Sequence, residues 1–232
     1  MTYQTYQPAI DRNYRDTGFS KWMDDASKGA EYGWRFFQMN DDFSRLVQNT
    51  LSLNGMQEAH IRAGNVAQGF AATASTISAT RFIFSWEKFL SGKMFYKNDG
   101  EPRSWLLVAV DTLVLAARTL SPFTWLNTLK AIDLGKYAAM MSSTIIGAFS
   151  GATVLYFFHA IYEAAYSELG IRECGNEARE AVVASFDLLA FPFQCGFGPG
   201  GTPAWVIAGY AVSALSGVIY FANEIYSAYT EG

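Results

Sequence analysis

The sequence contains few of the residues that build covalent or metal-centred sites. Among its 232 residues are two cysteines, Cys174 and Cys195, and two histidines, His60 and His159. Two cysteines cannot form a disulfide framework or a four-cysteine zinc site, and the histidines lie too far apart in sequence for metal-ligand spacing. We therefore expect no metal ion and no cofactor.

Sequence signatures of common enzymes are also missing. The stretch GFGPGGTP lacks the Gly-Lys-Ser/Thr ending of a phosphate-binding loop, and no Gly-x-Ser-x-Gly elbow occurs. The two histidines have no nearby acid and nucleophile in the arrangement of a catalytic triad. These absences predict a protein that is not an enzyme and has no catalytic residue.

Positive charge is scarce in the second half of the chain. Twelve of the 17 lysines and arginines precede Trp105, and none follows Arg179. The net charge is −4 and the pI about 5.2, whereas nucleic-acid binding needs a clustered basic surface. We expect no nucleic-acid partner, a polar N-terminal half that faces water and a C-terminal half embedded in a lipid bilayer.

Two long runs without a charged side chain are the strongest signal in the sequence. They cover residues 137–162 and residues 204–223. As a helix the first run would be about 39 Å long, enough to cross a hydrocarbon core of about 30 Å. The runs predict two main transmembrane helices. The alternative is two buried helices of a soluble core, which the mean hydropathy of +0.07 also allows.

Both runs carry small residues at every fourth position. Such stripes let two helix backbones approach closely inside a bilayer. We therefore expect the two spans to pack on each other through the small stripes Ala139, Ser143, Gly147 and Gly151 on the first helix and Gly209, Ser213 and Gly217 on the second.

The chain is expected to have three parts. Residues 1–28 show no sustained period and are predicted to form a loosely ordered arm. Residues 29–103 are predicted to form an amphipathic helical region, with one helix that Asn54 and Gly55 end and a longer one over about 56–90. Residues 104–232 are predicted to be the membrane-embedded helical region. The predicted class is all-α, with N-terminal amphipathic helices and two main transmembrane helices.

The stretch ATRFIFSWEKFL is the sharpest amphipathic segment. Its aromatic and aliphatic residues share one helical face, and its basic residues lie opposite. A helix lying among lipid headgroups needs this pattern, because rings sink to the acyl boundary while Arg and Lys reach phosphates. A helix packed on its neighbours has the same period. The candidate membrane-inserting residues are Arg81, Phe82, Ile83, Trp86, Lys88, Phe89 and Leu90.

Charged residues within apolar segments mark a candidate polar seam. Asp111 and Arg118 are seven residues apart on one helical face, so they could satisfy each other or line a seam between helices. The alternative is an interfacial helix with two solvated charges. Pro122 is expected to end or kink that helix. Asp187 lies in a shorter apolar segment, and neither segment is counted among the main spans.

Three segments together resemble the peroxin-eleven family, peroxisomal membrane proteins that elongate and proliferate the organelle. SATRFIFSWEKFL resembles the family's Ser-x-x-Arg amphipathic segment, with Arg81 at the arginine and Lys88 at a later basic position. VVASFDLLAF resembles the segment around an aspartate before the last span, here Asp187. ALSGVIYFANEIYSAY is similar to the family's C-terminal pattern, with Gly217 at the glycine. The resemblance covers about residues 43–229.

The resemblance implies a membrane-shaping protein. It implies a multi-pass protein of the peroxisomal or glycosomal membrane with both termini in the cytosol. It also implies self-association, curvature generation by the N-terminal half, recruitment of the membrane fission machinery and a role in metabolite passage. A small pore or carrier for metabolites, and an accessory subunit of a membrane complex, are the alternatives.

Overall fold

The fold is all-α, as predicted. The computed structural model describes residues 18–97, 100–166, 179, 181–186, 188, 189 and 203–231. These residues form helices, turns and one isolated antiparallel β-bridge, between Tyr96 and Pro102. The main helices are α2 (Gly18–Leu53), α3 (Gln57–Thr80), α4 (Phe82–Leu90), α5 (Trp105–Thr128), α6 (Tyr137–Tyr166) and α9 (Pro203–Glu231).

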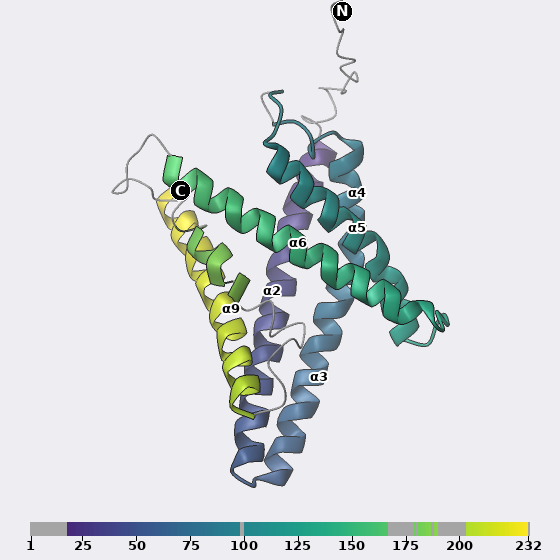
Figure 1. Ribbon diagram of the computed structural model, residues 1–232, viewed down its shortest axis with the longest axis vertical. Helices are drawn as coiled ribbons and strands as arrows, with labels where there is room; N and C mark the ends of the chain where they lie inside the picture. The colour runs from purple at the N-terminus through teal and green to yellow at the C-terminus, as the bar shows by residue number, and fades with distance from the viewer. Residues whose placement is uncertain are drawn as a thin grey trace, which may run out of the picture.

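The helices α2 and α3 form a long antiparallel hairpin (Figure 1). The hairpin turns where the sequence predicts, because Gly55 has a φ of +71°, which glycine adopts without steric cost. However, α2 already begins at Gly18, so residues 18–28 are helical rather than part of an arm. Packing stabilises this weakly periodic stretch, since Ser20 and Met23 are buried. The rest of the predicted arm lies outside the described residues.

The predicted helix over residues 56–90 is divided at Arg81, which lies in a turn between α3 and α4. The backbone at Arg81 has a φ of −68° and a ψ of −11°, and its N–H donates to the carbonyl of Ser78. This bond spans three residues rather than four, so the helix tightens for one turn before α4 begins. The division places the guanidinium of Arg81 inside the bundle, where it is 7% exposed.

Three helices are long and apolar enough to cross a membrane, namely α5, α6 and α9. Two of them are the predicted main spans, and α5 is an additional one. Pro122 was expected to end or kink this helix, but the helix continues through Pro122 to Thr128. Proline is tolerated inside transmembrane helices when neighbouring groups compensate. The missing N–H of Pro122 leaves the carbonyl of Arg118 without its helical donor, and the hydroxyl of the adjacent Ser121 donates to the preceding carbonyl, that of Ala117, at 2.9 Å.

The spanning helices turn their large apolar residues outward. In the most apolar stretches of α5 and α6 only 11% of residues are buried inside the protein. The residues that are buried are small, such as Ala117 and Ala152, whereas Phe158 and Val218 are 58% and 52% exposed. Burial of large apolar side chains is the main driving force of folding in water. Their exposure here supports a lipid-facing exterior and the fold of a helical membrane protein.

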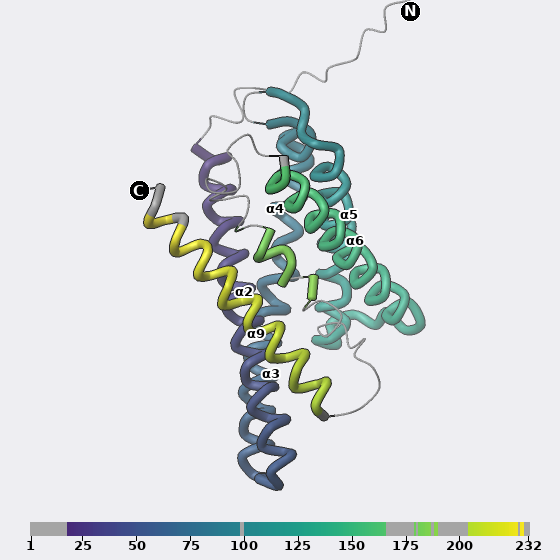
Figure 2. The backbone as a smooth tube through the Cα atoms, turned by 60° about the vertical axis from the view of Figure 1, so that its left-hand side comes forward, coloured from purple at the N-terminus to yellow at the C-terminus, as the bar shows by residue number. Residues whose placement is uncertain are grey.

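The two predicted spans do not form the main helix pair. Instead, α6 packs on α5, and α9 packs on α2 (Figures 1 and 2). The prediction that their small stripes pack on each other is therefore wrong. On α6, Gly151 approaches Leu113 of α5, while the remaining small residues are exposed, namely Ala139, Ser143 and Gly147.

The small stripe of α9 is buried, and its contacts lie on α2. Gly209, Ser213 and Gly217 are all buried. A Cβ added to Gly217 would lie 2.9 Å from both Cβ and Cγ of Met39, closer than side chains pack. At the other end of the contact, the hydroxyl of Tyr32 donates to Glu224 at 2.6 Å. The stripe thus serves close helix packing, but with a polar helix as its partner.

Replacing Gly217 with Leu should force α9 away from α2 and destabilise the protein by about 1–3 kcal/mol, the usual range for overpacking. Equilibrium unfolding in detergent micelles would measure the effect. Gly147→Leu is the matched control, because nothing lies within 4 Å of a Cβ added there. Equal losses in the two variants would contradict the observed helix pairing.

Candidate functional site

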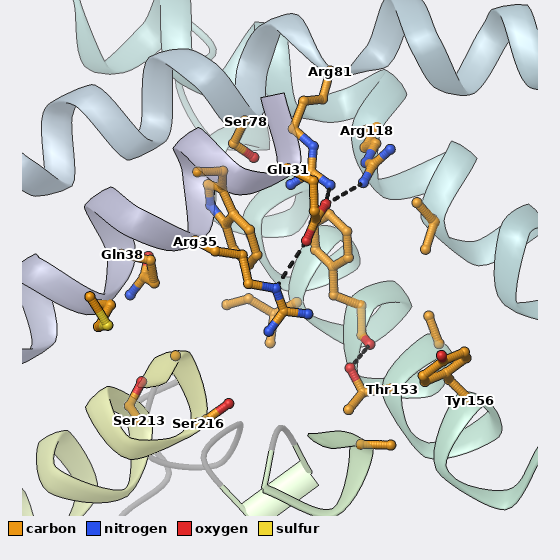
Figure 3. A pocket seen from close by; sticks show the side chains of 18 of the residues that line it. Glu31, Arg35, Gln38, Ser78, Arg81, Arg118, Thr153, Tyr156, Ser213 and Ser216 are labelled. Atoms are coloured by element: carbon orange, nitrogen blue, oxygen red, sulfur yellow. Dashed lines mark hydrogen bonds and ion pairs between the residues drawn. The ribbon is translucent and has the colours of Figure 1, made fainter. Parts of the chain in front are cut away.

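A partly open cavity with a volume of about 380 Å³ lies between the helices of the bundle. It is lined by residues of α2, α3, α5, α6 and α9, together with Arg81 between α3 and α4. Figure 3 shows charged and hydroxyl-bearing side chains that point toward one another across it. The apolar part of the wall comes from α5 and α6 and includes Val110, Val114, Ile146 and Phe149.

The carboxylate of Glu31, on α2, lies among three arginine side chains (Figure 3). Arg35 donates its Nε to Glu31 Oε1 at 3.0 Å. Arg81 forms an ion pair with Glu31 Oε2, and Nη2 of Arg118 lies 3.8 Å from the same oxygen. These four charged side chains are here called the Glu31 cluster.

Aromatic rings cover two of the three guanidinium groups of the Glu31 cluster. The guanidinium carbon of Arg35 lies 4.2 Å from the ring centroid of Tyr220, and that of Arg81 lies 5.1 Å from the ring of Trp34. Such contacts stabilise cations that have lost their water. Burial and the nearby Arg118 lower the pKa of Arg81 to about 9, so Arg81 remains protonated at neutral pH.

A second polar group lies further along α2, where Asp42 faces α9. Ser213 donates its hydroxyl to Asp42 Oδ2, and Nε2 of Gln38 lies 3.4 Å from Oδ1. Burial raises the pKa of Asp42 to about 6, although the hydrogen bond from Ser213 opposes this shift. The neighbouring Asp41 forms an ion pair with Arg45 at 2.7 Å. The small residue Ser213 of the predicted stripe thus has a polar role as well.

Asp111 and Arg118 line a polar seam between α4 and α5, one of the three arrangements that the sequence allowed. Asp111 forms ion pairs with Lys88, at 2.8 Å, and with Arg103. Arg118 donates Nη1 to the hydroxyl of Ser85 at 3.0 Å and reaches Glu31 with Nη2. The seam therefore joins the Glu31 cluster. Asp187, the third predicted member, lies outside the described residues.

The basic side of α4 faces the interior of the bundle. Arg81 is buried and paired with Glu31, whereas Lys88 is 39% exposed and paired with Asp111. Both cations thus pair with acids of the bundle rather than with the lipid phosphates that the headgroup interpretation expected. The sequence could not reveal these ion pairs, because the two acids lie on other helices. The opposite side of α4 faces outward. Phe82 is partly buried, Trp86 and Phe89 are a little more than one-third exposed, and Ile83 and Leu90 are at least half exposed.

Sequence reasoning missed Glu31, Arg35 and Asp42, which carry much of the site. On an amphipathic helix these residues look like a solvated face. One signal was present: Glu31 and Arg35 are four residues apart, the spacing of an ion pair on one helix. Their partners lie 50 and more residues away, so no local pattern could have found the cluster.

Among the residues that the structure describes, no group of three or more His, Cys, Asp or Glu side chains could hold a metal ion. The chemistry of the cavity is therefore that of guanidinium, carboxylate and hydroxyl groups beside an apolar wall. Such a site can bind a ligand through charge and shape. Comparison of the chain with protein-family models, with curated proteins and with solved structures finds no match.

Proposed function

We propose that this membrane protein binds a small polar solute in the cavity of its bundle and acts as a carrier or small pore. The observation that carries the proposal is the Glu31 cluster, a group of charged side chains beside a pocket that α5, α6 and α9, the three helices apolar enough to cross a membrane, help to line. Ionisable residues inside membrane proteins are costly to keep, and they commonly mark solute or ion pathways.

A purely structural ion-pair network is the competing explanation. Such a network needs its charges balanced and its surroundings closely packed, because each unpaired buried charge costs several kcal/mol. The Glu31 cluster instead borders about 380 Å³ of unfilled volume. That volume lies within the usual range of small-molecule sites, about 300–1,000 Å³. Unfilled volume beside charged side chains favours a binding site.

Liposomes that contain the purified full chain should swell in small polar solutes that do not permeate protein-free liposomes. Val114→Trp should reduce swelling to the protein-free level, because the indole would fill a cavity that Val114 lines. Val154→Trp is the matched control, since Val154 lies on the outer side of α6 and is 38% exposed. Absence of swelling with the parent chain, or equal swelling with both variants, would exclude the carrier or pore.

Membrane shaping is a second candidate function, and the exposed side of α4 favours it. Ile83 and Leu90 are 50% and 76% exposed on a short helix at one end of the bundle. This apolar surface could enter one leaflet of a bilayer and enlarge its area. Because Arg81 is buried and Lys88 is paired with Asp111, the contact would be hydrophobic. Tubulation of vesicles by the full chain should therefore persist at high salt and be lost in Leu90→Asp.

The resemblance to the peroxin-eleven family adds a proposed location in the peroxisomal or glycosomal membrane. It also adds self-association and contact with membrane fission proteins as proposed interactions. The three apolar helices support the membrane part of this proposal. Fluorescence localisation of the tagged full chain tests the organelle, and a distribution in other membranes would refute it.

A further inference from the structure

We infer that the outer side of α2 contacts the acyl chains of the bilayer, beside the apolar helix α9. This surface lies outside the cavity, so its contact with lipid goes beyond the proposed carrier or pore and does not depend on it. Three features of α2 support the contact: the depth at which the helix lies, the inward direction of its central charges and the spacing of its exposed charges.

The depth of α2 follows from its pairing with α9. The two helices run side by side in both views (Figures 1 and 2). Their contacts stay in antiparallel register and pair Tyr32 with Glu224, Arg35 with Tyr220, Met39 with Gly217, Asp42 with Ser213 and Arg45 with Tyr210. Residues 210–224 lie within the part of α9 that is long and apolar enough to cross a membrane. A bilayer that α9 crosses therefore surrounds residues 32–45 of α2 as well.

The charged residues in this part of α2 are turned toward the other helices. They form ion pairs or hydrogen bonds within the bundle, and they are Glu31, Arg35, Asp41, Asp42 and Arg45. None of these side chains is more than one-third exposed. A helix on the surface of a soluble protein directs its charges outward, into water. Inside a membrane the charges face the bundle instead, because acyl chains cannot solvate them.

The outer side of the same stretch is aromatic. Phe36 and Phe43 lie seven residues apart, so they share one face of α2, and they are 48% and 58% exposed. The amide of Asn40 needs no water there, because its Nδ2 donates to the carbonyl of Phe36 at 2.8 Å. On α9, Val218 lies at the level of Phe36 and is 52% exposed. Exposed apolar surfaces mark contacts with membranes or proteins, and continuity with α9 favours the membrane.

Exposed charges occur only at the two ends of the α2–α3 hairpin. Several are exposed at the start of α2, the last of them on Lys28, and the next along the chain are on Glu58 and Arg62, just after the turn. No charged residue between Lys28 and Glu58 is exposed. The helix from Lys28 to Leu53 is about 37 Å long, slightly more than a hydrocarbon core of about 30 Å. Both ends of the hairpin can therefore reach water while its middle contacts lipid.

Spin labels on the full chain in phosphatidylcholine liposomes test this contact, with Cys174 and Cys195 replaced by Ser. Labels at Phe36→Cys and Phe43→Cys should collide with oxygen, which concentrates in the bilayer, and should lose nearly all collisions with a water-soluble nickel chelate. Lys28→Cys and Arg62→Cys are the controls, because both residues are exposed at the ends of the hairpin. Their labels should collide readily with the nickel chelate.

Two results would overturn the inference. Ready collision of the labels at 36 and 43 with the nickel chelate would show that water covers this side of α2. Few collisions with either reagent would show that protein covers it, and spin–spin broadening at position 36 would identify that protein as a second copy of the chain. A label at Phe158→Cys on α6 guards against misfolding: if it still prefers oxygen, the bundle is inserted and only the position of α2 is refuted.

Discussion

Replacing Glu31 with Gln should destabilise the protein by about 3–5 kcal/mol, the usual cost of removing one partner from a buried ion pair. Glutamine preserves the shape of the side chain and can still accept hydrogen bonds. It cannot neutralise Arg81, which is 7% exposed and would then lie beside Arg35 and Arg118 without a counter-charge. Equilibrium unfolding in detergent micelles, followed by circular dichroism, would measure the loss.

Glu58→Gln provides the matched control for this substitution. Glu58 also pairs with an arginine on its own helix, Arg62, but their side chains are 91% and 82% exposed. Exposed pairs contribute about 0–1 kcal/mol, because water and salt screen them. If Glu31→Gln cost no more than Glu58→Gln, the Glu31 cluster would not be the buried network that the structure describes.

Stability of the parent chain should fall between about pH 4 and pH 6 because of Asp42. The pKa of Asp42 is raised from 3.8 to about 6 in the folded protein, mainly by burial. The folded state therefore binds the proton more tightly than the unfolded state, and it loses stability as the pH rises through this window. The loss is about 3 kcal/mol once both states are ionised. Burial also raises the pKa of Asp41, which acts in the same direction.

The Asp42→Asn variant should lose little stability between pH 4 and pH 6, and it should be more stable than the parent chain at pH 7. The amide keeps an oxygen that can accept the hydrogen bond from Ser213, but it carries no charge to desolvate. The two proteins should be equally stable near pH 4, where Asp42 of the parent is protonated. Asp25→Asn, at an exposed position of α2, should keep the parent profile. A stability curve of Asp42→Asn that matches the parent at every pH would contradict the burial of this carboxyl group.

The predictable part of the fold is the part that local pattern determines. The uncharged runs identified α6 and α9, and Gly55 marked the end of the first helix. The additional span, α5, was not counted among the main spans because Asp111 and Arg118 interrupt its apolar run. Both charges are accommodated by partners inside the bundle, so they do not prevent an apolar outer surface.

Helix pairing could not be predicted, because a small residue indicates close approach but not the approaching helix. A Cβ added to Gly217 would contact Met39 on α2, whereas one added to Gly147 would have no neighbour within 4 Å. Both glycines belong to stripes with the same spacing. For a similar reason, only part of the candidate site could be predicted from the sequence. Arg81 and Arg118 stood out in apolar surroundings, while their shared partner Glu31 lay on a helix whose charges looked solvated. Only the folded chain brings α2, α5 and the α3–α4 turn together.

The central claim is that a charged interior lies within a lipid-facing exterior, and spin labels on α6 test it most directly. Phe158→Cys places a label on the outer side, where Phe158 is 58% exposed, and Thr153→Cys places one in the cavity. In liposomes the label at 158 should collide with oxygen, which concentrates in the bilayer, and hardly with a water-soluble nickel chelate. The label at 153 should show the opposite preference. A label at 158 that collides freely with the nickel chelate would contradict the account.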